Sequence, residues 1–352
     1  MKIQKGKSLL LIAAIIFIVL YIIFAARPLA KEYNFTPVWK LDTTAKTEAQ
    51  EGATGIPFKL NQTVGYFSED GKLLLAQPFP AKAAISDDYY SLYNTSGNSI
   101  PLYDKSGKLH TTIKSSGFPF FDNGNIFIFL AGGASFAKYN AEGKCLWLYE
   151  GVFPITAFNS TQDYTAVGFA DGKIKLFDNE SGNTIMTYEP AGSNYPIILG
   201  IAVSKDGQYI ASVSGQEEQR FVIAKNENSK SKIIYHEFLD SELTRRTQVY
   251  FTADGNRVLF DCGEKVGIYD FITNKPYSIK INKQIISVEE SENLIFLLGK
   301  NNNDYTVYIV EKTNILEGAF SFTAYNAFIK TFNEALYIGK DSTISKISLS
   351  RD

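Results

Sequence analysis

The amino-acid sequence predicts an all-β fold, a β-propeller of four-stranded antiparallel blades preceded by one N-terminal transmembrane helix. Three observations lead to this prediction. One uncharged apolar run lies near the N-terminus. The rest of the chain consists of short stretches of alternating hydrophobicity separated by turn residues. Finally, one sequence unit recurs about every 40 residues, the period of propellers whose blades hold four strands.

The apolar run covers residues 8–26 and carries no charged side chain. At about 1.5 Å per residue, a helix of this length spans a hydrocarbon layer about 30 Å thick. The run is too long for the apolar part of a cleaved signal peptide and does not end in a small-x-small site. Lys2, Lys5 and Lys7 precede it, which favours a cytoplasmic N-terminus, residues 1–7. We therefore expect an uncleaved single-pass anchor with the propeller on the extracytoplasmic side, periplasmic or extracellular.

One repeat unit can be read as a whole between residues 153 and 190. It contains the apolar runs ITAF, DYTAVGF, GKIKLFD and NTIMTYE, with turn residues between them. Four short strands joined by tight turns form one blade, and such a sheet must stack on its neighbours to bury its apolar faces.

The third strand of this unit is its most recognisable part, because an apolar run there ends in a polar turn. Eight copies occur, so eight blades are favoured, and seven result if the first copy merges with the last one. The copies begin at Val64, Ile100, Phe136, Ile174, Phe221, Val266, Val307 and Ile344.

The last copy is not followed by a fourth strand, so the final blade needs an edge strand from elsewhere. PVWKLD, residues 37–42, has the pattern of the fourth strand CLWLYE, residues 145–150, with tryptophan at the same place. We expect 37–42 to complete the last blade within a propeller of residues 37–352. Residues 27–36 are then a linker, and residues 43–55 form a weak, loop-like start of the first blade.

Several third strands end in an aromatic-Asp pair, such as Tyr103-Asp104 and Phe177-Asp178, which resembles the Trp-Asp ending of WD repeats. Residues 139–151, YNAEGKCLWLYEG, resemble the repeat of quinoprotein-like propellers. The resemblance implies a docking platform, or a cofactor-free scaffold of envelope protein assembly.

The quinone-dependent dehydrogenases of the same architecture need a tryptophan stacked on the cofactor. The two tryptophans of this chain, Trp39 and Trp147, fall in predicted outer strands instead. The resemblance therefore implies no cofactor.

The charges and histidines argue against several other functions. Lys plus Arg number 35 against 37 Asp plus Glu, so no net positive field attracts nucleic acid. Only two histidines occur, His110 and His236, without the spacing of a zinc or Ser-His site. We predict no catalytic, cofactor-binding or metal-binding residue and no enzyme. Adjacent carboxylates such as Glu289-Glu290 leave a glycosidase-like pair across the ring open, although solvated turn acids are the simpler interpretation.

The repeat departs most from its pattern between residues 195 and 245, where the spacing of third strands widens. Loops carry binding functions more often than strands do. Glu217, Glu218, Arg245 and Arg246 lie in these insertions and form a candidate interaction surface, unless the long loops are merely solvated.

The sequence thus favours a non-catalytic scaffold that binds a protein, another envelope or membrane protein in particular. The alternative is an enzyme or a small-ligand sensor that uses the central funnel of the propeller.

Overall fold

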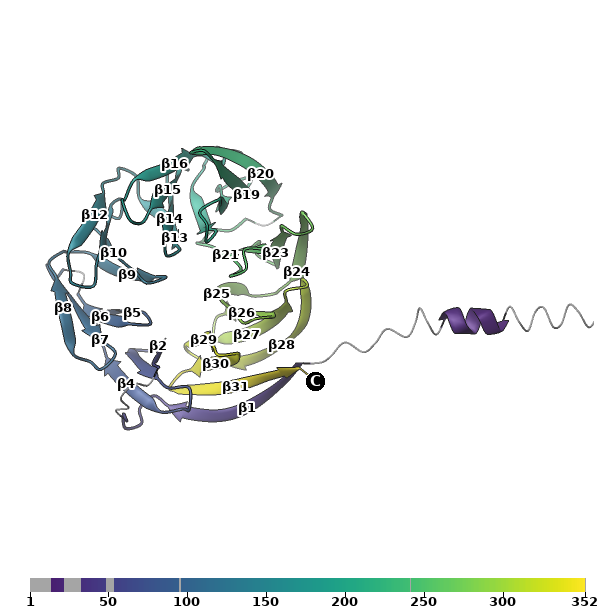
Figure 1. The fold of residues 1–352 in the computed structure, drawn as a ribbon, viewed down its shortest axis with the longest axis horizontal. Helices are drawn as coiled ribbons and strands as arrows, with labels where there is room; N and C mark the ends of the chain where they lie inside the picture. Colours follow the sequence, from purple (N-terminus) through teal and green to yellow (C-terminus); the bar gives the residue numbers. More distant parts are fainter. Residues whose placement is uncertain (1–13, 22–32, 49–53, 95, 241, 352) are drawn as a thin grey trace, which may run out of the picture.

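The fold was analysed in a computed structural model that describes residues 14–21, 33–48, 54–94, 96–240 and 242–351. Its strands form eight antiparallel sheets arranged as blades around a central axis (Figure 1). Seven sheets have four strands, and one has three among the described residues. The all-β, eight-bladed propeller predicted from the repeat is confirmed.

We number the blades along the chain. Blade 1 holds β2 (Ile56–Leu60), β3 (Thr63–Phe67) and β4 (Leu73–Pro78). Blade 2 holds β5 (Lys82–Ile85), β6 (Tyr89–Tyr93), β7 (Ile100–Asp104) and β8 (Leu109–Ile113). Blade 3 holds β9 (Phe118–Asp122), β10 (Asn125–Phe129), β11 (Phe136–Tyr139) and β12 (Cys145–Tyr149). Blade 4 holds β13 (Ile155–Ser160), β14 (Tyr164–Phe169), β15 (Ile174–Asp178) and β16 (Thr184–Tyr188).

The second half of the ring repeats this arrangement. Blade 5 holds β17 (Ile198–Val203), β18 (Tyr209–Ser214), β19 (Arg220–Glu227) and β20 (Lys230–Phe238). Blade 6 holds β21 (Val249–Phe251), β22 (Arg257–Asp261), β23 (Lys265–Asp270) and β24 (Lys275–Lys280). Blade 7 holds β25 (Gln284–Glu290), β26 (Leu294–Asn301), β27 (Asp304–Glu311) and β28 (Ile315–Thr323). Blade 8 holds β29 (Ala327–Phe332), β30 (Ala335–Lys340), β31 (Thr343–Arg351) and, as its outermost strand, β1 (Tyr33–Asp42).

The burial of a strand depends on its place in the blade. Second strands such as β14 and β26 are buried on both sides, because neighbouring blades cover both faces of each sheet. Outermost strands such as β20 and β28 are mostly exposed, and half-buried residues alternate with exposed ones only toward their ends. The alternating and the continuous apolar runs of the sequence therefore correspond to two positions in the blade.

Strand direction divides the ring into two faces. Because strands alternate in direction, the connections between the first and second and between the third and fourth strands share one face. We call this the opposite face. The crossover face holds the second-to-third hairpins and the connections that lead from each blade to the innermost strand of the next.

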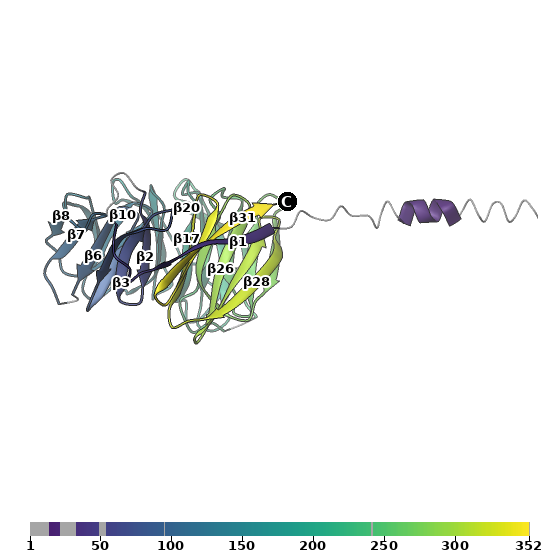
Figure 2. The same ribbon diagram turned by 90° about the horizontal axis from the view of Figure 1, so that it is seen from below.

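The ring is closed by β1, which pairs antiparallel with β31 from Tyr33↔Arg351 to Asp42↔Thr343 (Figure 2). The predicted closing strand, residues 37–42, lies within β1. The strand starts earlier than predicted, at Tyr33, because β31 extends to Arg351 and offers partners to residues 33–36. Residues 33–36, predicted as linker, are thus part of the blade, and Tyr33 and Phe35 pack against the core between blades 7 and 8.

A tryptophan fastens the closing strand to blade 1. The indole Nε1–H of Trp39 donates to the carbonyl oxygen of Glu69 at 3.1 Å. Lys346, which pairs with Trp39 across the β1–β31 ladder, donates its ammonium to the same oxygen at 3.3 Å. The ring of Trp39 covers Gly71, where φ is +87° and an added Cβ would lie 2.9 Å from the indole. Blade 8 is thereby joined to the β3–β4 turn of blade 1.

The same clamp recurs between blades 3 and 4. Trp147 and Lys138, paired across β11 and β12, both donate to the carbonyl oxygen of Asn179 at 2.9 Å. Trp147 covers Gly182, where an added Cβ would lie 2.5 Å from the ring. This correspondence explains why Trp39 and Trp147 occupy the same place in the two fourth-strand patterns.

The clamp also identifies the strands of blade 1. Because the β3–β4 turn meets Trp39 as the β15–β16 turn meets Trp147, β3 and β4 correspond to the third and fourth strands. No strand occurs in the described residues 43–48 and 54–55, so β2 is the innermost described strand of this blade. Of the segment 43–55, predicted as a weak, loop-like start of the first blade, residues 49–53 lie outside the described residues.

The predicted membrane segment, residues 8–26, lies largely outside the described residues. Its described part, residues 14–21, is helical. Among the described residues, no helix combines the length and the hydropathy needed to cross a membrane.

Candidate binding cavity on the crossover face

A cavity of about 540 Å³ opens on the crossover face, among the innermost strands of blades 3 to 6. The starts of β9, β13 and β17, and the residues that lead into β21, form its walls. Figure 1 shows β9, β13 and β21 around the centre of the ring. The volume falls within the range of sites that bind small molecules or short peptide segments.

One wall of the cavity is aromatic. Phe129 and Phe158 have ring centroids 4.9 Å apart, and Phe120 lies 5.7 and 5.5 Å from them, all edge to face. Phe118 stands at 6.4 Å from Tyr93 in the same edge-to-face geometry. Phe118 and Phe120 are 41% and 37% exposed. The wall therefore offers aromatic surface to a ligand at positions where a strand normally presents polar side chains.

The cavity contains one charged side chain among its described lining residues, Arg246. Its Nη2 donates to the carbonyl oxygen of Ile155 at 3.4 Å, so the guanidinium reaches from blade 6 toward the edge of blade 4. The amides of Asn159 and Gln248 also line the cavity, but they bind backbone groups of neighbouring blades. Arg246 is thus the lining group most available to an anionic ligand.

The four predicted interaction residues lie on two segments of the crossover face. Glu217 and Glu218 are exposed on the β18–β19 hairpin, and Arg245 and Arg246 lie between β20 and β21. Buried Gln219 joins the two segments: its Nε2 donates to the carbonyl oxygen of Leu243 at 2.6 Å, and its Oε1 accepts from the N–H of Leu243 at 2.5 Å.

No ion pair links the two acids to the two arginines among the residues the structure describes. Arg245 instead pairs with Asp261, whose side chain is 0% exposed, at 2.9 Å. Arg246 points into the cavity lining. Adjacent residues of an extended segment point to opposite sides, and so the two arginines differ in role.

Exposed apolar side chains also lie on the connections that lead into strands lining the cavity. Val152 and Phe153, 87% and 47% exposed, lie on the connection that leads into β13. Tyr195, 56% exposed, lies on the connection into β17. The crossover face thus carries exposed apolar side chains both in the cavity, at Phe118, and on two connections between blades. The sequence signal for this surface is a strand such as FPFF, in which every residue is apolar. Because side chains alternate in direction along a strand, some of these apolar residues must be exposed.

The paired carboxylates Glu289 and Glu290 lie at the other side of the ring, near the opposite face. Glu289 accepts hydrogen bonds from the N–H and hydroxyl of Thr331 in blade 8, at 3.0 and 3.1 Å. Glu290 accepts from the hydroxyl of Tyr250 and the N–H of Ala253, both of blade 6, at 3.0 and 2.8 Å. The two acids therefore tie blade 7 to its two neighbours, which is a structural role for this pair.

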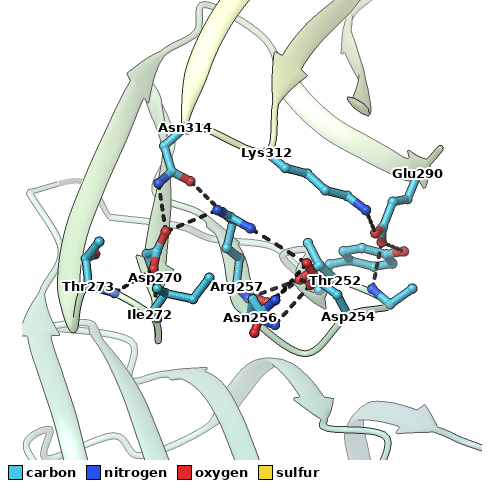
Figure 3. A network of polar contacts seen from close by, with 12 residues as sticks. Thr252, Asp254, Asn256, Arg257, Asp270, Ile272, Thr273, Glu290, Lys312 and Asn314 are labelled. Atoms are coloured by element: carbon cyan, nitrogen blue, oxygen red, sulfur yellow. Dashed lines mark hydrogen bonds and ion pairs between the residues drawn. The ribbon is translucent and has the colours of Figure 1, made fainter. Parts of the chain in front are cut away.

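A second polar network joins blades 6 and 7 around Arg257 (Figure 3). Its guanidinium lies between Asp270, 3.3 Å away, and Asp254, 3.8 Å away, and Nε donates to Asn314 of blade 7 at 3.1 Å. Burial disfavours the charged form of Asp270, but hydrogen bonds and Arg257 outweigh it and lower the pKa of this carboxyl. Beside this network, Lys312 pairs with Glu290 at 2.5 Å. The charged side chains around Arg257 therefore stabilise the contact between blades 6 and 7.

The pH dependence of stability tests the burial of Glu289 between blades 7 and 8. Burial raises the pKa of Glu289, Asp87 contributes in the same direction, and Lys330 and Thr331 oppose them. Because the folded chain then holds the proton more tightly than the unfolded chain, stability falls as pH rises from the ordinary pKa of 4.5 through the raised value. Glutamine accepts the same two Thr331 hydrogen bonds without a charge.

We therefore expect Glu289→Gln to be as stable as the wild type near pH 7, or more stable. It should lose less stability than the wild type as pH rises above the ordinary pKa of 4.5. Urea unfolding at a series of pH values measures this slope, with exposed Glu292→Gln as the control. If the stability of Glu289→Gln depended on pH as that of the wild type does, the raised pKa of Glu289 would be contradicted.

Comparison with known proteins agrees with the observed fold. A family model described as "beta-propeller protein" matches residues 1–351. A protein of Treponema pallidum (strain Nichols), described as uncharacterized, is 24% identical over 363 residues, covering 99% of this chain and 96% of that protein.

Solved structures with the same fold are more distant in sequence. BamB from Moraxella catarrhalis has a TM-score of 0.64 at 12% identity, covering 90% of this chain and 100% of its own. The computationally designed Ika8 protein has a TM-score of 0.59 at 14% identity, over 87% and 98% of the two chains. The Myceliophteria thermophila Cps50 (Swd1) beta-propeller domain has a TM-score of 0.52 at 12% identity, over 75% and 93%. At these identities the likeness is one of fold.

Proposed function

This chain belongs to the beta-propeller protein family, and from that premise we propose that it is a non-catalytic scaffold that binds a protein partner through its crossover face. The observation that supports this proposal is the exposed apolar surface of the crossover face, which comprises Phe118 in the cavity and Val152, Phe153 and Tyr195 on the connections into β13 and β17. Exposed apolar side chains gathered at one place are typical of interaction sites. The adjacent carboxylates of Glu289 and Glu290 accept hydrogen bonds from the two neighbouring blades.

We further propose that residues 8–26 anchor the chain in a membrane, with the propeller on the extracytoplasmic side. The uncharged apolar sequence and the preceding lysines support this proposal. As the fourth strand of its blade, β1 starts on the opposite face, so the chain reaches the ring at Tyr33 on the side away from the cavity. An anchored propeller would then direct its crossover face away from the bilayer, toward another envelope or membrane protein.

The face used for binding can be tested by photo-crosslinking in intact cells. A photoreactive amino acid at Val152 on the crossover face should give a defined crosslinked product. The same residue at Ile272, 64% exposed on the opposite face, should not. Equal crosslinking at both positions, or crosslinking at Ile272 alone, would contradict the proposed face. No product at either position would contradict the scaffold itself.

A further inference from the structure

We propose that the cavity on the crossover face binds a peptide segment in which an aromatic residue is followed directly by an acidic one. The aromatic side chain enters the Phe-lined wall, and the carboxylate pairs with Arg246. This inference rests on the proposed function and adds the chemistry of the partner.

The aromatic residue of the proposed peptide is inferred from the phenylalanine rings that remain exposed at the cavity wall. Phe120, Phe129 and Phe158 meet one another edge to face, yet Phe120 remains 37% exposed and Phe118 remains 41% exposed. Aromatic rings favour such edge-to-face or offset contacts with a further ring. A partner's aromatic side chain would continue the cluster and remove this surface from water.

The acidic residue of the proposed peptide is inferred from the positive charge among the residues that line the cavity. Arg246 is exposed, and its one side-chain hydrogen bond among the described residues goes to a neutral carbonyl oxygen at 3.4 Å. No described acidic residue lines the cavity. The contrast with Arg245 is direct, because Asp261 already neutralises that guanidinium. A planar guanidinium without a carboxylate partner is suited to a bidentate pair with a ligand carboxylate.

The surroundings of the cavity favour a peptide over a small molecule. Val152, Phe153 and Tyr195 are exposed outside the cavity, on the two successive connections that lead into its lining strands β13 and β17. A small aromatic acid would leave these side chains uncovered, whereas a chain that runs across the mouth would cover them.

Fluorescence anisotropy with the full-length chain in detergent tests this proposal. The probe is a labelled decapeptide of glycine and serine that carries one central Phe-Asp pair. Matched peptides carry Phe-Asn or Ala-Asp, and 3-phenylpropionate serves as a small-molecule competitor. The protein variants are Arg246→Gln, Phe118→Ala and the control Lys82→Gln, which removes an exposed charge from the same face in blade 2.

We expect the Phe-Asp peptide to bind the wild type with micromolar affinity. Phe-Asn and Arg246→Gln should each weaken binding at least about tenfold, because each removes one partner of a charged hydrogen bond. Their combination should weaken it little further, while Lys82→Gln should bind like the wild type. Ala-Asp and Phe118→Ala should each weaken binding through lost aromatic contact.

Three outcomes would overturn the inference. These are the absence of Phe-Asp binding, equal losses in Arg246→Gln and Lys82→Gln, or full competition by 3-phenylpropionate at the affinity of the peptide. The last result would indicate a small-ligand site. If crosslinking at Val152 persists while the peptide fails, the scaffold function stands and only the assigned peptide chemistry falls.

Discussion

Replacing Trp39 with alanine is expected to weaken the closure of the ring and to destabilise the propeller by about 2–4 kcal/mol. The substitution removes a half-buried indole that packs 6.1 Å from Phe67 and 5.9 Å from Tyr337, measured between ring centroids. It also removes the hydrogen bond to Glu69 across the interface between blades 8 and 1. Urea unfolding measures the loss of stability.

Trp147→Ala is the matched control, because it removes the same clamp inside the ring rather than at its closure. Both variants should lose stability to a similar degree. Only Trp39→Ala should also make β1 accessible to protease under native conditions, since Trp39 ties β1 to blade 1 by a hydrogen bond to Glu69. Equal protection of β1 in both variants would contradict a special role of Trp39 in closure.

Replacing Arg245 with alanine is expected to cost about 3 kcal/mol of stability, because it leaves the carboxylate of Asp261 buried without its countercharge. The side chain of Asp261 is 0% exposed, and its other contact is the N–H of Gly263 at 2.8 Å. Arg246→Ala should leave stability nearly unchanged, since Arg246 is exposed and has no carboxylate partner among the described residues.

A double-mutant cycle with Asp261→Asn separates the ion pair from other effects of the substitution. Arg245→Ala in the Asp261→Asn background should cost much less than in the wild type. Equal costs in the two backgrounds would show that Arg245 acts through packing alone. Thermal unfolding of the four proteins supplies the comparison.

The repeat could be read from the sequence because its signals are local. Each predicted third strand, from Val64 to Ile344, lies in the third strand of its blade, since an apolar run and its polar turn form within a single hairpin. Trp39 indicated the closing strand for the same reason: its clamp needs a tryptophan at a fixed place in the fourth strand. The earlier start of β1 could not be seen, because it depends on how far β31 extends at the other end of the chain.

The cavity could not be predicted in the same way, because its residues come from several blades. Phe118 and Phe120 can be recognised as cavity residues only when it is known which side of β9 faces the cavity. The sequence also treats Arg245 and Arg246 alike, whereas the structure gives one a buried countercharge and the other a place in the cavity. The packing between blades decides which of two adjacent residues points into the cavity. No local sequence pattern predicts this direction.

The pairing of Tyr33 with Arg351 has a consequence for the order in which the protein folds. Strands β2 to β31 can each form a hairpin with a neighbour in sequence, but β1 finds its partner only after all the other strands of the ring have been synthesised. Until then the chain carries an unpaired edge on β1, and forming this longest-range contact is slow. During biogenesis, the interval before β31 arrives is therefore the period in which a chaperone, or β31 of a second copy, could capture β1.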